Sequence, residues 1–115
     1  MAIAENCPGK ISYSHFKAPG RRFNGKVTPL RIAIGISRKR LAVYSNSGRA
    51  ELIDSRFGEP NFNALEITLE EGDRISFRVD YDRLDDPKVS GVITIRARTP
   101  EAAGIVAEIE HRLGR

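Results

Sequence analysis

Apolar and polar residues alternate over several short stretches of the chain, which is the pattern of a β-strand with one buried face. The clearest stretch is RISFRVDYD, residues 74–82, in which every second residue is apolar. The preceding stretch, LEITLEEGD (65–73), has the same period and contains Glu71–Gly72, a pair suited to a tight hairpin turn. Together they predict an antiparallel hairpin that is buried on one side only.

Five further stretches have the same period, and they are residues 10–18, 31–37, 40–46, 50–57 and 91–99. The expected inner face of the hairpin formed by 31–37 and 40–46 consists of Ile32, Ile34, Ile36, Leu41 and Val43. In the first stretch, one side is expected to carry Ile11, Tyr13 and His15, and the other Phe16. The chain thus predicts seven short strands. Strands with short connections are expected to pair with their sequence neighbours as antiparallel meanders.

The period changes at the end of the chain, in TPEAAGIVAEIEHRLG (99–114). Thr99 is the expected N-cap of a helix. The apolar residues recur at helical spacing, and they are Ala102, Ile105, Val106, Ile109 and Leu113. Glu108 and Arg112 stand one turn apart on the expected solvent side. Gly104 is expected to mark the place where this amphipathic helix lies close against a sheet.

These elements predict a mainly β domain of the α+β class. It would be a seven-stranded antiparallel barrel or two packed sheets, closed by one C-terminal helix. A chain of 115 residues suits a single domain, which we expect at residues 10–114, with residues 1–9 as a loose N-terminal segment. No apolar run approaches the ~18 residues of a membrane span. The N-terminus does not resemble a secretory signal and the only cysteine cannot form an internal disulfide, so we expect a cytoplasmic protein.

Charge divides the chain into two unlike halves. Residues 1–50 contain ten Lys and Arg residues and one acid, a net charge of +9. Residues 51–115 contain nine Lys and Arg residues and fourteen acids, a net charge of −5. This asymmetry predicts a positive side that attracts anionic membranes, acidic proteins or nucleic acid.

Two motifs resemble the pleckstrin-homology-like (PH-like) fold, in particular its compact bacterial and GRAM-type members. IAIGISRKRLAVYS (32–45) is similar to the strand–turn–strand hairpin of these domains, and TIRARTPEAAGIVAEIEHRL (94–113) resembles their last strand and closing helix. The likeness extends over residues 10–114. It implies a seven-stranded barrel that serves as a binding scaffold without chemistry of its own. In lipid-binding members, the loop between the first two strands supplies the cations that bind inositol phosphates.

The corresponding loop in this chain is HFKAPGRRFNGKVTPLR, residues 15–31. Its cations form the candidate anion-binding site, and they are Lys17, Arg21, Arg22, Lys26 and Arg31. Arginine offers phosphate two parallel hydrogen bonds, and lysine adds a point charge. Arg38 and Lys39, in the turn of the next hairpin, are candidate extensions of this basic face, whereas Arg40 is expected to serve the turn itself.

Phe23 lies among these charges, at the expected tip of the loop. An exposed Phe23 could insert into a bilayer interface or stack on a nucleic-acid base. The alternative is a solvated basic loop with Phe23 folded back onto the barrel, since phenylalanine is usually buried.

No combination of residues predicts catalysis, a metal site or a cofactor. Cys7 lies in the expected loose N-terminus, and His15 and His111 lack the spacing of a metal pair. The acidic run at 80–86 lacks the glycine and the final glutamate of a calcium loop. We therefore expect a protein that is not an enzyme.

The leading hypothesis is a non-enzymatic interaction module in the cytoplasm, or peripheral to the membrane. Its basic loop would recruit an acidic protein or an anionic membrane surface. Two alternatives stay open. One is weak nucleic-acid binding by the same face, which would fall steeply with salt. The other is assembly through a partner strand that pairs with an exposed sheet edge.

Overall fold

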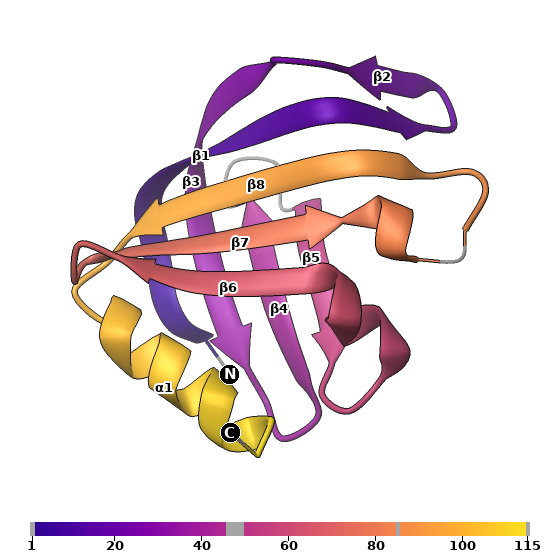
Figure 1. Cartoon of the computed structure of the whole chain (residues 1–115). Helices are drawn as coiled ribbons and strands as arrows, with labels where there is room; N and C mark the ends of the chain where they lie inside the picture. The colour runs from indigo at the N-terminus through magenta and orange to yellow at the C-terminus, as the bar shows by residue number, and fades with distance from the viewer. Residues whose placement is uncertain (1, 46–49, 85, 115) are drawn as a thin grey trace.

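The computed structural model describes residues 2–45, 50–84 and 86–114. The strands in these ranges are β1 (Ala2–Ala18), β2 (Arg21–Phe23), β3 (Val27–Ile36), β4 (Arg40–Ser45), β5 (Ala50–Arg56), β6 (Leu65–Glu70), β7 (Arg74–Asp80) and β8 (Ser90–Arg98) (Figure 1). The helices are the short 3-10 helices η1 (Pro60–Ala64) and η2 (Tyr81–Arg83), and the α-helix α1 (Ala102–Arg112).

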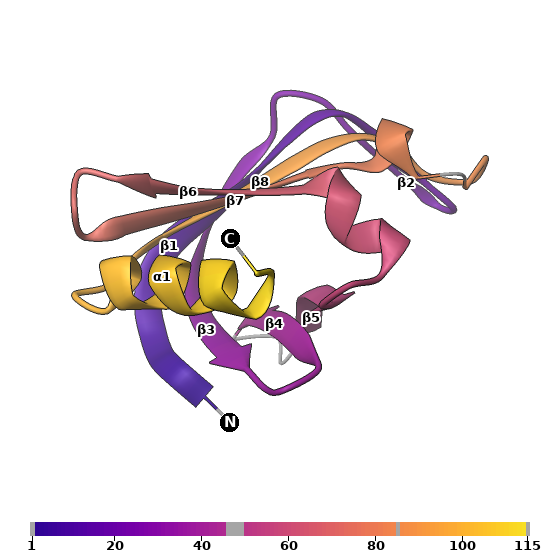
Figure 2. The same cartoon turned by 60° about the horizontal axis from the view of Figure 1, so that its bottom comes forward.

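The strands form one antiparallel sheet in the order β5-β4-β3-β1-β8-β7-β6, while β2 pairs with β1 outside this order. The sheet curls into a half-barrel whose ends are β5 and β6, and α1 lies in the opening between its two halves (Figures 1 and 2). The predicted fold class, seven antiparallel strands in series and one C-terminal helix, is confirmed. The three-residue strand β2 is an addition to it.

The core fills the space between the curled sheet and α1. Its largest fully buried side chains are Phe77, Ile32, Ile34, Ile36, Leu41, Ile75, Ile95, Ile105, Ile109 and Val43. They include every residue predicted for the inner face of hairpin β3–β4. The alternation in the sequence therefore identified the buried faces of β3, β4 and β7 correctly.

β1 is longer than the sequence predicts. Residues 2–9, expected to belong to a loose N-terminal segment, form its first half, and Ala2 pairs with Gly35 of β3. Ala4 and Cys7 are buried and belong to the hydrophobic core. The expectation of a loose segment is wrong for these residues, because their small side chains pack into the core.

The alternation of side chains between the two faces of β1 is interrupted at His15, whose φ is 50°. The pairing of β1 with β8 shifts register between Ser14 and Lys17, so that Phe16 is buried and His15 is exposed. The predicted placement of His15 beside Ile11 is therefore wrong. Such a bulge inserts one extra residue and reverses the side-chain alternation beyond it.

The C-terminal helix begins later than expected. Thr99 was the predicted N-cap, but α1 starts at Ala102, and Thr99 Oγ1 accepts a hydrogen bond from the Glu101 amide (3.2 Å) in a preceding turn. The predicted pair of Glu108 and Arg112 is confirmed, with Arg112 Nε donating to Glu108 Oε1 (2.7 Å). Gly104 is exposed and has open space around it, so the expected close approach to the sheet is wrong.

Candidate functional site

The predicted basic loop is largely a β-hairpin. β1 continues to Ala18, turns through Pro19 and Gly20, and returns as β2, with Lys17 opposite Arg22 and Ala18 opposite Arg21. We call residues 16–23 the basic hairpin. The residues around its turn line a shallow hollow of about 280 Å³, and they are Lys17, Ala18, Gly20, Arg21 and Arg22. Three predicted cations therefore lie together at one end of the molecule (Figure 1).

Ion pairs distinguish seven arginines of the described residues from the seven candidate cations. The arginines with a carboxylate within 4.0 Å are Arg40, Arg74, Arg78, Arg83, Arg96, Arg98 and Arg112. All seven candidate cations, Lys17, Arg21, Arg22, Lys26, Arg31, Arg38 and Lys39, are exposed, and none pairs with an acid of the described ranges. Lysine or arginine opposite another cation across a strand pair is unfavourable on its own. Binding of an external anion would reduce the electrostatic repulsion between Lys17 and Arg22.

Phe23 packs against the barrel instead of projecting from it. Its ring lies 4.9 Å from the ring of Tyr13 and stacks on that of Phe16 at 6.3 Å, between ring centroids. Lys26 Nζ lies 4.4 Å from the centroid of the Phe23 ring, a cation–π contact. Phe23 is thus partly buried and forms part of an aromatic cluster. This is the alternative weighed from the sequence, and it leaves no projecting ring for insertion or base stacking.

Arg38 and Lys39 lie at the other end of β1 from the basic hairpin. They occupy the turn after β3, whose last residues run beside the N-terminal end of β1, with Gly35 opposite Ala2. In this turn, Ser37 Oγ accepts hydrogen bonds from the amides of Lys39 (3.3 Å) and Arg40 (3.2 Å). The structure therefore does not bring Arg38 and Lys39 together with Arg21.

Arg40 and Arg31 both lie away from the basic hairpin. Arg40 Nη1 donates to Asp54 Oδ2 of β5 (2.9 Å), and the negative charge of Asp54 raises the pKa of the guanidinium above its usual value. This contact fits the structural role expected for Arg40. Arg31 lies on β3 opposite Pro8, in the middle of the sheet and away from the hollow at the hairpin end.

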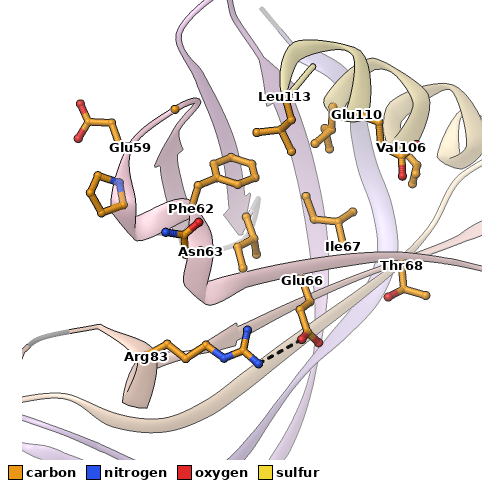
Figure 3. A pocket seen from close by; sticks show the side chains of 14 residues that line it. Glu59, Phe62, Asn63, Glu66, Ile67, Thr68, Arg83, Val106, Glu110 and Leu113 are labelled. Atoms are coloured by element: carbon orange, nitrogen blue, oxygen red, sulfur yellow. Dashed lines mark ion pairs between the residues drawn. The ribbon is translucent and has the colours of Figure 1, made fainter. Parts of the chain in front are cut away.

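A larger hollow than the one at the hairpin lies between α1, η1 and β6 and has a volume of about 630 Å³ (Figure 3). We call it the α1–β6 groove. Its apolar lining residues include Phe62, Leu65, Ile67, Val106, Ile109 and Leu113. Figure 3 shows Phe62, Ile67 and Leu113 directed into the groove, whereas Glu66 turns toward Arg83 on the other side of β6. The sequence did not predict this groove, because one wall is α1 and the other is the continuous segment of η1 and β6, which is distant from α1 along the chain.

Cys7 is a core residue. Its thiol is buried and donates a hydrogen bond to the carbonyl oxygen of Glu5 (3.7 Å). Burial raises the pKa of the Cys7 thiol above its usual value, although a hydrogen bond with Thr99 lowers it in part. The thiolate needed for nucleophilic attack is therefore disfavoured in the folded protein.

We expect a disulfide reagent such as 5,5′-dithiobis(2-nitrobenzoate) to label Cys7 on the order of 100-fold more slowly in the native protein than in urea-unfolded protein. Labelling should accelerate as pH rises toward the raised pKa. Stopped-flow absorbance measures both rates. Equal rates in the native and unfolded protein would show that Cys7 is accessible and contradict its place in the core.

The described aspartates of the acidic run accept hydrogen bonds from nearby backbone amides. Asp80 Oδ1 accepts from the amide of Asp82 (3.1 Å), Asp82 Oδ1 from that of Gly91 (3.1 Å), and Asp86 Oδ1 from that of Lys88 (2.9 Å). Asp85 lies outside the described residues. Within the described ranges, no group of three or more His, Cys, Asp or Glu side chains is placed to hold a metal ion. In that same part of the chain, no helix has both the length and the hydrophobicity of a membrane span.

Neither the comparison with protein-family models nor the comparison with curated proteins gave a match for this chain. The site is therefore interpreted from its own residues.

Proposed function

We propose that the protein is a non-enzymatic binding module of the PH-like type that attaches to an anionic membrane surface through its basic hairpin. The single observation that carries the proposal is the grouping of three exposed, unpaired cations around one hollow at the hairpin end of the molecule. Lys17, Arg21 and Arg22 surround a hollow there, while the arginines of β7, β8 and α1 are paired with acids.

The shape of the hairpin end supports a surface as the ligand. Its hollow is shallow, and the side chains of Lys17 and Arg22 stand opposite one another on neighbouring strands. Cations spread in this way can meet several lipid phosphates at once, and each Lys or Arg near an anionic leaflet contributes about 1 kcal/mol of attraction. Three or four such cations give a useful but reversible affinity.

The packing of Phe23 defines the kind of attachment. Because its ring contacts Tyr13 and Phe16 and lies under Lys26, the hairpin has no projecting aromatic ring to bury in the bilayer. Attachment would then be electrostatic, and salt would screen it. The same packing disfavours single-stranded nucleic acid, since stacking on an aromatic ring supplies much of that affinity.

Vesicle co-sedimentation tests the proposal. The protein should sediment with phosphatidylcholine vesicles that contain phosphatidylserine, but not with phosphatidylcholine alone. Binding should disappear at about 1 M salt, where the Debye length is about 3 Å. Parallel mixtures with polyglutamate and with a DNA duplex identify the ligand class. Tighter binding to either polymer than to the anionic vesicles at equal salt would reject the membrane as the ligand.

A further inference from the structure

The α1–β6 groove runs along the edge of a strand. Four consecutive residues of β6 line it, namely Leu65, Glu66, Ile67 and Thr68. Successive side chains of a strand point to opposite faces, so a cavity that contacts four in a row borders the strand's edge. β6 is the last strand in the sheet order, with β7 as its neighbour on the other side. Its outer backbone groups therefore have no strand partner in the described structure, and such an edge accepts an added strand.

The inner side of the groove is apolar and not fully covered. Ile67 of β6, Val106 of α1 and Leu113, the C-cap of α1, are partly buried hydrophobic residues packed against the core. They face one another across the groove, and Phe62 of η1 lies to one side of them (Figure 3). An added strand beside β6 would place every second side chain among these residues. At these positions of the added strand, apolar side chains would pack best.

Three acids, Glu59, Glu66 and Glu110, and one base, Arg83, line the groove. Glu59 precedes η1 on one wall and Glu110 lies on α1 on the other (Figure 3), and neither has an ion-pair partner among the described residues. Glu66 on the strand itself is shared by Arg78 (3.6 Å) and Arg83 (3.7 Å). Two unpaired carboxylates on opposite walls favour a cationic ligand.

β7 shows what pairs well with β6. Across the existing ladder, Arg74 stands opposite Glu70 and Arg78 opposite Glu66, while Ile75 and Phe77 fill the inner face. β7 thus alternates apolar residues with polar ones, of which Arg74 and Arg78 are basic and Ser76 is neutral. The free edge of β6 presents the same side chains to any strand on its other side.

We propose that the α1–β6 groove binds an extended peptide in which basic and apolar residues alternate, and that the peptide adds to β6 as a further strand of the sheet. The apolar residues enter between Phe62, Ile67 and Val106, and the basic residues meet Glu59 and Glu110. This peptide site lies apart from the basic hairpin, so one module holds a cationic partner while its hairpin contacts an anionic surface.

The test uses a fluorescein-labelled eight-residue peptide in which arginine alternates with valine and leucine. Fluorescence anisotropy should show saturable binding to the full chain. A peptide of the same composition with its arginines grouped at one end, and an alternating peptide with glutamate for arginine, should bind roughly tenfold more weakly or not at all. Equal binding of either control peptide would overturn the proposal.

Variants of the groove locate the peptide. Glu59→Lys combined with Glu110→Lys should weaken binding by roughly tenfold, because two attractions become repulsions. Val106→Arg should block the groove, whereas Ala107→Arg, an exposed position on α1 outside the groove lining, adds the same charge and should leave binding unchanged. Circular dichroism melting confirms that each variant folds. Binding that survives both groove changes, or that falls equally with Ala107→Arg, would contradict this site.

Two further readouts decide the occupant. In a ¹⁵N-labelled sample, the peptide should shift the amide signals of residues 65–70 and leave those of β5, the other end of the sheet, unchanged. Shifts at β5 would reject the groove. Sedimentation velocity of the free protein should show a monomer, and a concentration-dependent dimer that Val106→Arg abolishes would assign the groove to a second copy of the chain.

Discussion

Gly91→Ala is expected to lower the free energy of unfolding by more than about 3 kcal/mol, because no side chain fits at this position. The φ of Gly91 is 89°, and an added Cβ would lie 2.2 Å from the carbonyl oxygen and 2.5 Å from the carbonyl carbon of His15. These are backbone atoms of the β1 bulge, and they cannot move without breaking the pairing of β1 with β8. Since β1 and β8 join the two halves of the sheet, the substitution weakens the whole fold.

Gly72→Ala is the matched control. Gly72 also has a positive φ, 77°, but no atom of its surroundings lies within 4 Å of an added Cβ. Its substitution carries only the backbone strain, about 1 kcal/mol. Urea unfolding followed by circular dichroism measures both variants. Equal losses at the two glycines would mean that His15 does not press on Gly91, and the bulge would have to lie elsewhere.

Phe77→Ala is expected to cost about 3–5 kcal/mol of unfolding free energy, since it removes the largest fully buried side chain and leaves a cavity. Phe77 has no exposed surface, and it lies on β7 with Ile95 of β8 opposite it and Ile67 of β6 on the other side. A domain of this size has about 5–15 kcal/mol of stability in total, so the variant would be marginal.

Leu69→Ala provides the comparison for Phe77→Ala. Leu69 is an apolar residue of the period-two stretch 65–73, but 39% of its surface is exposed. We expect its loss to cost less than about 1 kcal/mol, because a partly exposed side chain loses less transfer free energy and leaves no enclosed cavity. The same urea titrations compare the two variants. A loss at Leu69 as large as that at Phe77 would show that β6 is buried at its end and not at the rim of the half-barrel.

The parts of the fold that sequence reasoning predicted are those governed by local periodicity. Period two identified β3, β4 and β7 together with their buried residues, and helical spacing identified the buried residues of α1. These patterns report directly which side chains leave water, which is the dominant favourable term in folding. The turn at Glu71–Gly72 followed from its residues in the same way, and both have positive φ in the structure.

The parts that could not be predicted depend on contacts between distant segments. Nothing near His15 in sequence indicates that it adopts a positive φ, because the partner of the bulge, Gly91, lies on another strand. The N-terminal residues looked loose, since Ala4 and Cys7 are small and interrupted by polar residues, yet both pack in the core. A strand that pairs with a strand on each side can form even where its own sequence does not alternate clearly between apolar and polar residues.

The candidate site was predicted in part. Five of the cations were named from their place in the loop at residues 15–31, but their grouping was not predicted. The pairing of β2 with β1 turns part of the loop into a hairpin, and the end of β3 places Arg38 and Lys39 at the other end of β1. The position of Phe23 depends on Tyr13 and Phe16, which meet it only after the hairpin forms. For the groove, the only available signal was the acidic residues near Phe62 and Val106, and acidic residues on a surface are common.

The most direct test of the proposed attachment compares two charge reversals of equal size. Arg21→Glu with Arg22→Glu changes the basic hairpin, and Arg38→Glu with Lys39→Glu makes the same change in net charge at the other end of β1. On phosphatidylserine-containing vesicles at low salt, the hairpin variant should lose roughly 100-fold or more in partition coefficient, and the distant variant clearly less. Equal losses, or none in the hairpin variant, would contradict attachment through the basic hairpin.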